Sequence, residues 1–362
     1  MAIASRRTAR ETQVMRLLKT LTEAHGPSGD EARVRKIIQE ELKGYVDEMR
    51  VDRLGNLIAR KKGKGNRVMV AAHMDEIGLM VKKIDSEGHI KFSTVGGIEP
   101  VTLIGQSVRI YRKRGTLACF GIITFAELHE DHEIDEMPDL EDLYIDTGLS
   151  KVALERKGID IGCYVIARHH FKTLGNDNII SGKALDDRLG CFALIEVARR
   201  LNKAPRDIFF VFTVQEEIGL YGAQISTYEL DPDWGLAVDT INAEDSDEFT
   251  TKGVEMGKGP TILVKDADII TNKETNDWIA AVAKIKKIPL QLRVEEEGTT
   301  DATKMFLSRE AIPATTITIP VRNLHSTVGI AHMKDVNNMI ELVLALLKRP
   351  ARDLPPPMKR FR

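Results

Sequence analysis

Apolar residues recur along most of this 362-residue chain in two patterns, one helical and one strand-like. Near the N-terminus, Val14, Leu17, Leu18 and Leu21 have the three- and four-residue spacing of an amphipathic helix. Residues 67–73 (RVMVAAH) are instead a nearly continuous apolar run, which is typical of a strand covered on both faces of a sheet. The first part of the chain therefore predicts an α/β fold.

The pattern predicts a second helix within residues 26–45, where Ser28 and Glu31 have the spacing of a capping box. We therefore expect these two side chains to cap the start of that helix. Residues 48–62 follow with a strand-like pattern that turns at Gly55.

The pattern of apolar and polar residues changes after Gly78. Residues 79–170 alternate short strand patterns with glycine and charged turns, and a helical period returns only near residue 149. A series of short strands without helices, inside an α/β chain, predicts an inserted β-rich domain at residues 78–170. Helices and apolar strands alternate again from about residue 180. Residues 1–77 and 171–350 then form one discontinuous α/β domain, and we expect residues 351–362 to be a mobile tail.

Composition and charge narrow the class of protein. The chain is 43% hydrophobic and 29% charged, with a net charge of −2, which describes a globular protein without an electrostatic reason to bind nucleic acid or anionic lipid. An apolar run long enough for a membrane span is absent from the sequence, and the basic N-terminus lacks the apolar region of a secretory signal. Cys119 and Cys163 could pair, but three widely spaced cysteines fit a reducing compartment better, so we expect a cytoplasmic location.

Candidate metal ligands follow the apolar runs or stand beside a helix start. They are His73, Asp186, Glu217, Asp239 and His325. Ligands in open α/β sheets collect beyond the carboxyl ends of the strands, so residues far apart in the sequence can meet at one sheet edge. Two histidines and three carboxylates are too many for one zinc site with an open position, but they suit two metals that share a bridging carboxylate. The pattern predicts a hydrolase that holds a water between two cations.

Further acids adjoin these ligands. Asp75 lies two residues after His73, so strand geometry lets one of the pair bind metal while the other orients it, although a surface histidine followed by helix-starting acids is the alternative. Glu216 and Glu217 end a hydrophobic strand, where two like charges need cations nearby or a bound proton. We expect one of them to bind metal and its neighbour to act as general base. Asp186, in the pair with Asp187, could alternatively serve only the helix dipole.

The motifs HMDEIG, KALDDR, QEEIGLYGA, AVDT, GTTDA and RNLHS, in this order, resemble the tetrahedral-aminopeptidase (TET) family, which includes cellulase-M-like proteins. The resemblance runs over nearly the whole chain. It implies a mixed-sheet α/β catalytic domain of the zinc-peptidase (phosphorylase/hydrolase-like) kind, interrupted by a β-rich (PDZ-like or barrel) domain. It also implies self-assembly into a large hollow homo-oligomer, typically a tetrahedral dodecamer, with contacts through the insertion.

The same resemblance implies a reaction and a ligand set. The protein would be a dinuclear metalloaminopeptidase that releases N-terminal residues from short peptides, with zinc or cobalt and with manganese as an option. The ligands of one metal would be His73, Asp186 and Asp239, and those of the other would be Asp186, Glu217 and His325.

The remaining implied roles concern the neighbours of the ligands. Glu216 would be the general base, Asp75 would orient His73, and the peptide bond between Asp186 and Asp187 would be cis. Thr299 and Thr327 depart from the family pattern, which bears on substrate preference more than on chemistry.

Three alternatives stay open at this point. A di-zinc deacetylase or carboxypeptidase has the same HxD motif that begins the series here, at His73 and Asp75, although the LDDR motif argues against this alternative. A metal-independent glycan hydrolase is suggested by the cellulase name of some relatives, but such enzymes work with two carboxylates and generally without metals. A scaffold without turnover would have lost ligands, and none of the five is missing. The acidic segment 126–142, with His129 and His132, is interpreted as a loop or lid and not as a second metal site.

Overall fold

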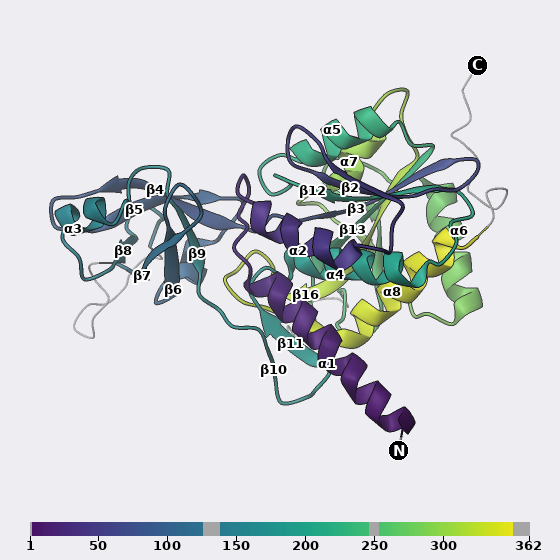
Figure 1. Ribbon diagram of the computed structural model, residues 1–362, viewed down its shortest axis with the longest axis horizontal. Helices are drawn as coiled ribbons and strands as arrows, with labels where there is room; N and C mark the ends of the chain where they lie inside the picture. The colour runs from purple at the N-terminus through teal and green to yellow at the C-terminus, as the bar shows by residue number, and fades with distance from the viewer. Residues whose placement is uncertain (1, 126–137, 246–252, 350–362) are drawn as a thin grey trace.

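The computed structural model describes residues 2–125, 138–245 and 253–349 of the chain. Most of the acidic segment 126–142 and the expected tail at 351–362 lie outside the described residues. The described chain folds into a large domain built on a mixed sheet and a smaller lobe beside it (Figure 1). The predicted fold class, a mixed-sheet α/β domain with an inserted barrel, is confirmed.

The large domain is organised around a sheet of eleven strands. Its centre is parallel, because β12 pairs with β3, β3 with β13 and β13 with β16 in the same direction. The main path of the sheet runs through β1 (Glu48–Val51), β2 (Leu57–Lys61), β12 (Asp207–Thr213), β3 (Arg67–His73), β13 (Trp234–Asn242), β16 (Ala314–Arg322), β17 (Gly329–His332), β11 (Ile179–Gly182) and β10 (Lys172–Thr173). Outside this path, β14 (Thr261–Lys265) pairs with β16 and with β15 (Gln291–Val294).

Helices cover both faces of this sheet (Figure 1). Along β3, Val68 and Val70 join one apolar core and Met69 and Ala71 the other, as the two-residue period of a strand requires. The first core is completed by α1 (Ala2–Glu23), α2 (Ala32–Leu42), α4 (Leu185–Arg200), α6 (Lys273–Lys286) and α8 (Met333–Leu347), and the second by α5 (Tyr221–Leu230) and α7 (Asp301–Phe306).

The smaller lobe is a closed barrel with its own apolar core. Its strands run in the order β4 (Gly78–Ile84), β5 (Ile90–Val95), β8 (Tyr144–Asp146), β7 (Leu117–Thr124), β6 (Ser107–Tyr111) and β9 (Tyr164–Ala167). A 3-10 turn at Pro100–Leu103 and a short helix, α3 (Lys151–Arg156), connect them. Because the barrel strands lie between Gly78 and Ala167, we propose residues 78–170 as the extent of the inserted domain.

One local prediction is wrong. Ser28 and Glu31 do not form a capping box, since α2 begins at Ala32 and the described residues give it no side-chain cap. The Ser28 hydroxyl instead donates to Asp75, and Glu31 accepts hydrogen bonds from backbone N–H groups. The buried surroundings of both side chains supply partners that the local sequence does not reveal.

Two further expectations have outcomes in the structure. All three cysteines are described and free, so Cys119 and Cys163 do not pair. The described helices include none that is both long enough and apolar enough to cross a membrane.

Candidate metal centre

The parallel strands at the centre of the sheet bring the predicted ligands to one edge. His73 is the last residue of β3, and Glu217 follows the end of β12. Asp239 lies near the end of β13, His325 follows β16, and Asp186 stands in the first turn of α4. Because the carboxyl ends of parallel strands meet at one edge, segments separated by up to 252 residues, from His73 to His325, converge there.

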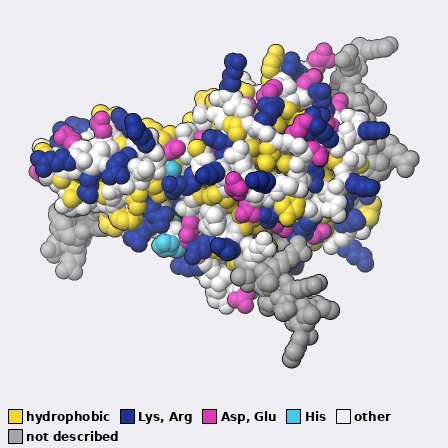
Figure 2. Space-filling view, in the orientation of Figure 1, with side chains coloured by type: hydrophobic (Ala, Val, Ile, Leu, Met, Phe, Trp, Pro, Cys, Tyr) yellow, Lys and Arg dark blue, Asp and Glu magenta, His cyan; other side chains and the backbone are white. Residues whose placement is uncertain are grey.

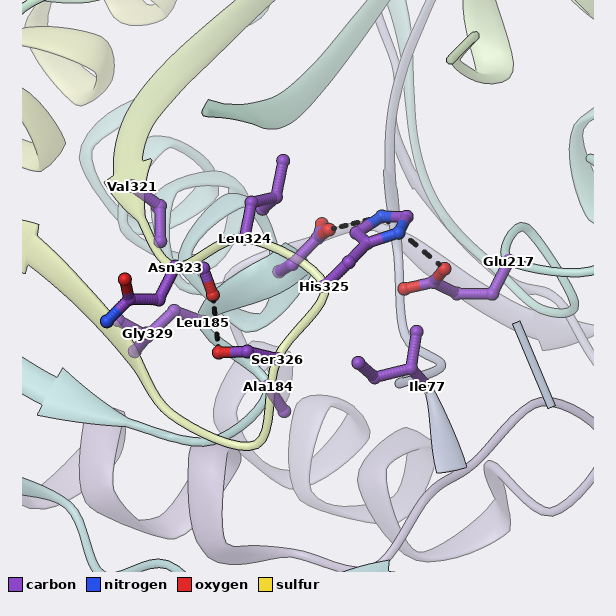
Figure 3. A pocket seen from close by; sticks show the side chains of 11 residues that line it. Ile77, Ala184, Leu185, Glu217, Val321, Asn323, Leu324, His325, Ser326 and Gly329 are labelled. Atoms are coloured by element: carbon purple, nitrogen blue, oxygen red, sulfur yellow. Dashed lines mark hydrogen bonds and ion pairs between the residues drawn. The ribbon is translucent and has the colours of Figure 1, made fainter. Parts of the chain in front are cut away.

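Asp186 lies at the middle of the cluster. Its Oδ1 is 3.1 Å from His73 Nε2, and its Oδ2 is 3.5 Å from His325 Nε2. Asp239 Oδ1 is 3.8 Å from His73 Nε2, and Glu217 Oε2 is 3.8 Å from His325 Nε2. His325 and Glu217 point toward one another across a pocket that Ile77 also lines (Figure 3). The five side chains thus form two groups of three, each with ligand atoms within 4.8 Å, and Asp186 belongs to both groups.

Carboxyl groups are concentrated at this edge of the sheet. Burial and nearby carboxylates raise the pKa of Glu217 to about 8, and burial and Asp186 raise that of Asp239 to about 7. Burial, together with the charges of Asp239 and Glu217, raises the pKa of Glu216 well above its usual range. Glu217 Oε1 is buried without a hydrogen-bond partner among the described residues. Imidazole and carboxylate donors with such an unpaired oxygen fit divalent cations, which would neutralise the cluster.

Asp75 connects His73, at the end of β3, to the turn after β12 that carries Glu217. Its Oδ1 lies 3.4 Å from His73 Nδ1, and its carboxylate accepts the backbone N–H groups of Glu216 and Glu217 at 3.1 and 3.2 Å. The Ser28 hydroxyl donates to Asp75 Oδ2 at 2.6 Å. Asp75 is therefore placed to hold the position of a ligand and of the turn after β12, although it belongs to neither ligand group.

The turn at Asp186 contains the cis peptide bond to Asp187 that the resemblance implied. Asp187 belongs to neither ligand group, and its Oδ1 accepts the backbone N–H of Gly190 at 2.9 Å. A β-carbon at Gly190 would stand 2.3 Å from this carboxylate, so only glycine leaves room for it. Of the two adjacent aspartates, only Asp186 belongs to the ligand groups.

Comparison with known proteins identifies the family. Residues 55–342 match the family model of the M42 glutamyl aminopeptidases. The chain belongs to this family. M42 enzymes are metal-dependent aminopeptidases, so the chain is a hydrolase that acts on peptide bonds. Family membership favours the aminopeptidase over the glycan hydrolase, the deacetylase or carboxypeptidase and the inactive scaffold that the sequence left open.

Individual relatives align with this chain over almost their full length. The lysyl aminopeptidase of Pyrococcus furiosus is 36% identical over 92% of this chain and 96% of its own. The TET aminopeptidase from the marine sediment archaeon Thaumarchaeota archaeon SCGC AB-539-E09 is also 36% identical, with a TM-score of 0.89 over 94% of this chain and 98% of its own. The Pyrococcus horikoshii TET1 peptidase, which can assemble into a tetrahedron or a large octahedral shell, is 33% identical, with a TM-score of 0.82 over 92% of this chain and 99% of its own.

Several buried charges of this M42 chain were not predicted from the sequence. Lys183 Nζ donates to both oxygens of Glu76 at 2.7 and 2.5 Å, and Arg188 donates to Glu76 Oε1 at 3.3 Å and to the carbonyl of Met74 at 2.8 Å. These residues stand inside the motifs HMDEIG and KALDDR, so the motifs mark them without revealing their role. They join the end of β3 to the turn that carries Asp186.

Asp301 is a further acid that the sequence reasoning missed. It is buried at the start of α7, where its Oδ2 accepts the Thr213 hydroxyl at 2.6 Å, and burial raises its pKa to about 6. It adds to the charge near Glu216 without joining a ligand group. Asp301 lies within the GTTDA motif, and that motif is the feature of the sequence that could have identified it.

Proposed function

We propose that this M42 aminopeptidase binds two divalent cations, one between His73, Asp186 and Asp239 and one between Asp186, Glu217 and His325. The observation that carries the proposal is the position of Asp186, whose two oxygens face different histidines. A carboxylate in that position can bridge two cations. Imidazole and carboxylate ligands accept zinc, cobalt or manganese, so the proposal covers all three metals.

Two bound cations would polarise the scissile carbonyl and lower the pKa of a water between them. We propose Glu216 as the group that accepts a proton from that water. Its Oε2 is 4.0 Å from His73 Nε2, yet Glu216 belongs to neither ligand group, so its carboxylate stays available. A carboxylate in this position can accept the proton from the water and pass it to the leaving amine. Asp75 would keep His73 in place during these steps.

The substrate class we propose is short peptides with a free N-terminus. The test uses a panel of aminoacyl chromogenic substrates, each with a free and an acetylated amino group, together with metal analysis of the purified protein. We expect cleavage of the free substrates only, two cations per subunit, and loss of cleavage after chelation. Equal cleavage of acetylated substrates, or full activity of the chelated protein, would contradict the proposal.

We also propose that the chain assembles with copies of itself through the barrel, as a route to a closed dodecamer. Phe120 and Ile122 lie two residues apart on β7, so they share one face of the strand, and their exposed fractions are 47% and 46%. Hydrophobic side chains are visible on the surface of this lobe (Figure 2). An exposed apolar strip of this kind is typical of a protein interface, and the P. horikoshii relative forms closed shells.

A further inference from the structure

The loop between α1 and α2 lies between the barrel and the metal centre. Pro27 forms a parallel bridge with Glu76, whose backbone N–H donates to the Gly26 carbonyl at 3.0 Å. On the other side, the Tyr164 hydroxyl of β9 donates to the Ser28 carbonyl at 2.9 Å. Ser28 is therefore held from the barrel side through its backbone, while its side chain faces the centre.

The Ser28 side chain acts on the centre through Asp75. Its hydroxyl donates to Asp75 Oδ2, the same oxygen that accepts the Glu217 N–H, while Asp75 Oδ1 accepts the Glu216 N–H. Ser28 and Asp75 are buried, and Glu216 and Glu217 expose only 10% and 3% of their side chains. A carboxylate with donors on both oxygens has one favoured orientation, and the Ser28 donor helps to select it.

Glu31 reaches the same turn by a second route. Its Oε1 accepts the backbone N–H of Gln215 at 3.2 Å and that of Gly29 at 2.6 Å. Gln215 has a φ of 55°, in the left-handed region that non-glycine residues seldom adopt, so its conformation needs support from its surroundings. Three consecutive N–H groups, those of residues 215–217, thus end on two carboxylates from other parts of the chain.

We propose that Ser28 and Glu31 are positioning residues for the turn that carries Glu216 and Glu217. The inference rests on the proposed roles of these two glutamates. Ser28 acts by fixing Asp75, and Glu31 acts by accepting the Gln215 N–H, for which an acceptor oxygen is needed and a charge is not. The capping-box spacing gives both side chains a local use at α2, but each is instead directed to the turn after β12.

The test compares Ser28→Ala, Glu31→Ala and Glu31→Gln with a matched control, Ser226→Ala. Ser226 is also fully buried, but its hydroxyl donates to the Gly222 carbonyl within α5. For each variant, kcat and KM are measured on an aminoacyl substrate. The metal-free protein is then titrated with Co²⁺, which gives both an affinity and a visible absorption spectrum, and the thermal midpoint is recorded.

We expect Ser28→Ala and Glu31→Ala to lower kcat or Co²⁺ affinity by about 10–100-fold, as for other residues that orient metal ligands. Their Co²⁺ spectrum should change while KM changes little. Glu31→Gln should behave like the wild type, because its amide oxygen still accepts both N–H groups. Ser226→Ala should alter the thermal midpoint alone.

Wild-type kcat and Co²⁺ spectra in both alanine variants would overturn the proposal, and so would a Glu31→Gln variant as impaired as Glu31→Ala. If Ser28→Ala does not fold, the comparison of kcat and the Co²⁺ spectrum between Glu31→Ala and Glu31→Gln still tests the proposal. Glu216→Gln separates this inference from the proposed function. Inactive Glu216→Gln with normal alanine variants overturns the positioning roles alone, whereas an active Glu216→Gln overturns the proposed mechanism.

Discussion

Glu76 and Lys183 form a buried ion pair, with 2.5 Å between Glu76 Oε2 and Lys183 Nζ, beside the metal centre. Glu76 lies three residues after His73, and Lys183 three residues before Asp186. Arg188 shares Glu76 and also donates to the carbonyls of Leu21 and Gly26. The pair therefore ties together the segments that carry His73 and Asp186, the proposed ligands whose Nε2 and Oδ1 atoms lie 3.1 Å apart, and Arg188 fastens both segments to the end of α1.

The first prediction concerns this ion pair. Glu76→Gln leaves the Lys183 and Arg188 charges buried without their carboxylate, so the free energy of unfolding should fall by about 3–5 kcal/mol. Urea denaturation of the metal-free protein measures this change. Glu48→Gln is the control, because Glu48 pairs with Arg60 and Lys62 on the surface, and it should leave the midpoint unchanged. Equal stability of Glu76→Gln and the wild type would contradict the prediction.

Glu31 should make stability depend on pH. Burial, with a contribution from the charge of Asp75, raises the pKa of Glu31 from 4.5 to about 7. Between these two values the folded protein binds more protons at Glu31 than the unfolded chain does, so this group's contribution to the free energy of unfolding falls as pH rises. Glu31→Gln should remove that fall. Denaturation of both proteins across this interval checks it, and parallel curves for the two would refute it.

The third prediction tests the general base. Glu216→Gln keeps the shape of the side chain but cannot accept a proton, so kcat should fall by about 10²–10⁴-fold. Metal content should be unchanged, because Glu216 belongs to neither ligand group. Steady-state kinetics and metal analysis on one preparation give both values. Near-normal turnover would remove Glu216 from the mechanism.

Metal binding should release protons. In the metal-free protein the pKa of Glu217 is raised to about 8, mainly by burial, and that of His325 to about 9, mainly by its hydrogen bond to Asp186. Near neutral pH both groups hold protons that a cation must displace, so affinity should rise with pH from about 6 to about 9. Calorimetric titration with Zn²⁺ in buffers of different ionisation enthalpy counts the released protons. An affinity that does not vary with pH would be inconsistent with these shifts.

The last prediction concerns assembly. Phe120→Lys places a charge in the exposed strip on β7, so it should convert the assembled form to smaller species. Size-exclusion chromatography with light scattering measures the mass. Ile285→Lys, at an exposed apolar position of α6 in the large domain, is the control and should assemble normally. Wild-type mass for the Phe120 variant would exclude this strip as an essential contact.

Elements with a strong apolar pattern could be predicted from the sequence. Residues 67–73 form β3 as expected, and the apolar run before Glu216 forms β12. Other elements were missed because their signals are weak. Tyr221–Leu230 (α5) has little segregation of polar and apolar positions, and Tyr144–Asp146 (β8) is too short to show a period.

Sequence alone determined the fold class and the residues proposed as ligands, because hydrophobic period and the order of the motifs can be read without the fold. The strand ends were less exact, since β12 ends at Thr213 and not at Glu216 and Glu217 as expected. Only the tertiary structure decided the partners of Ser28, Glu31 and Lys183. The local spacing of Ser28 and Glu31 fits a helix cap, but distant segments supply other partners for both side chains. Burial makes an unpaired polar group costly, so these side chains join the contacts that only the complete fold brings within reach.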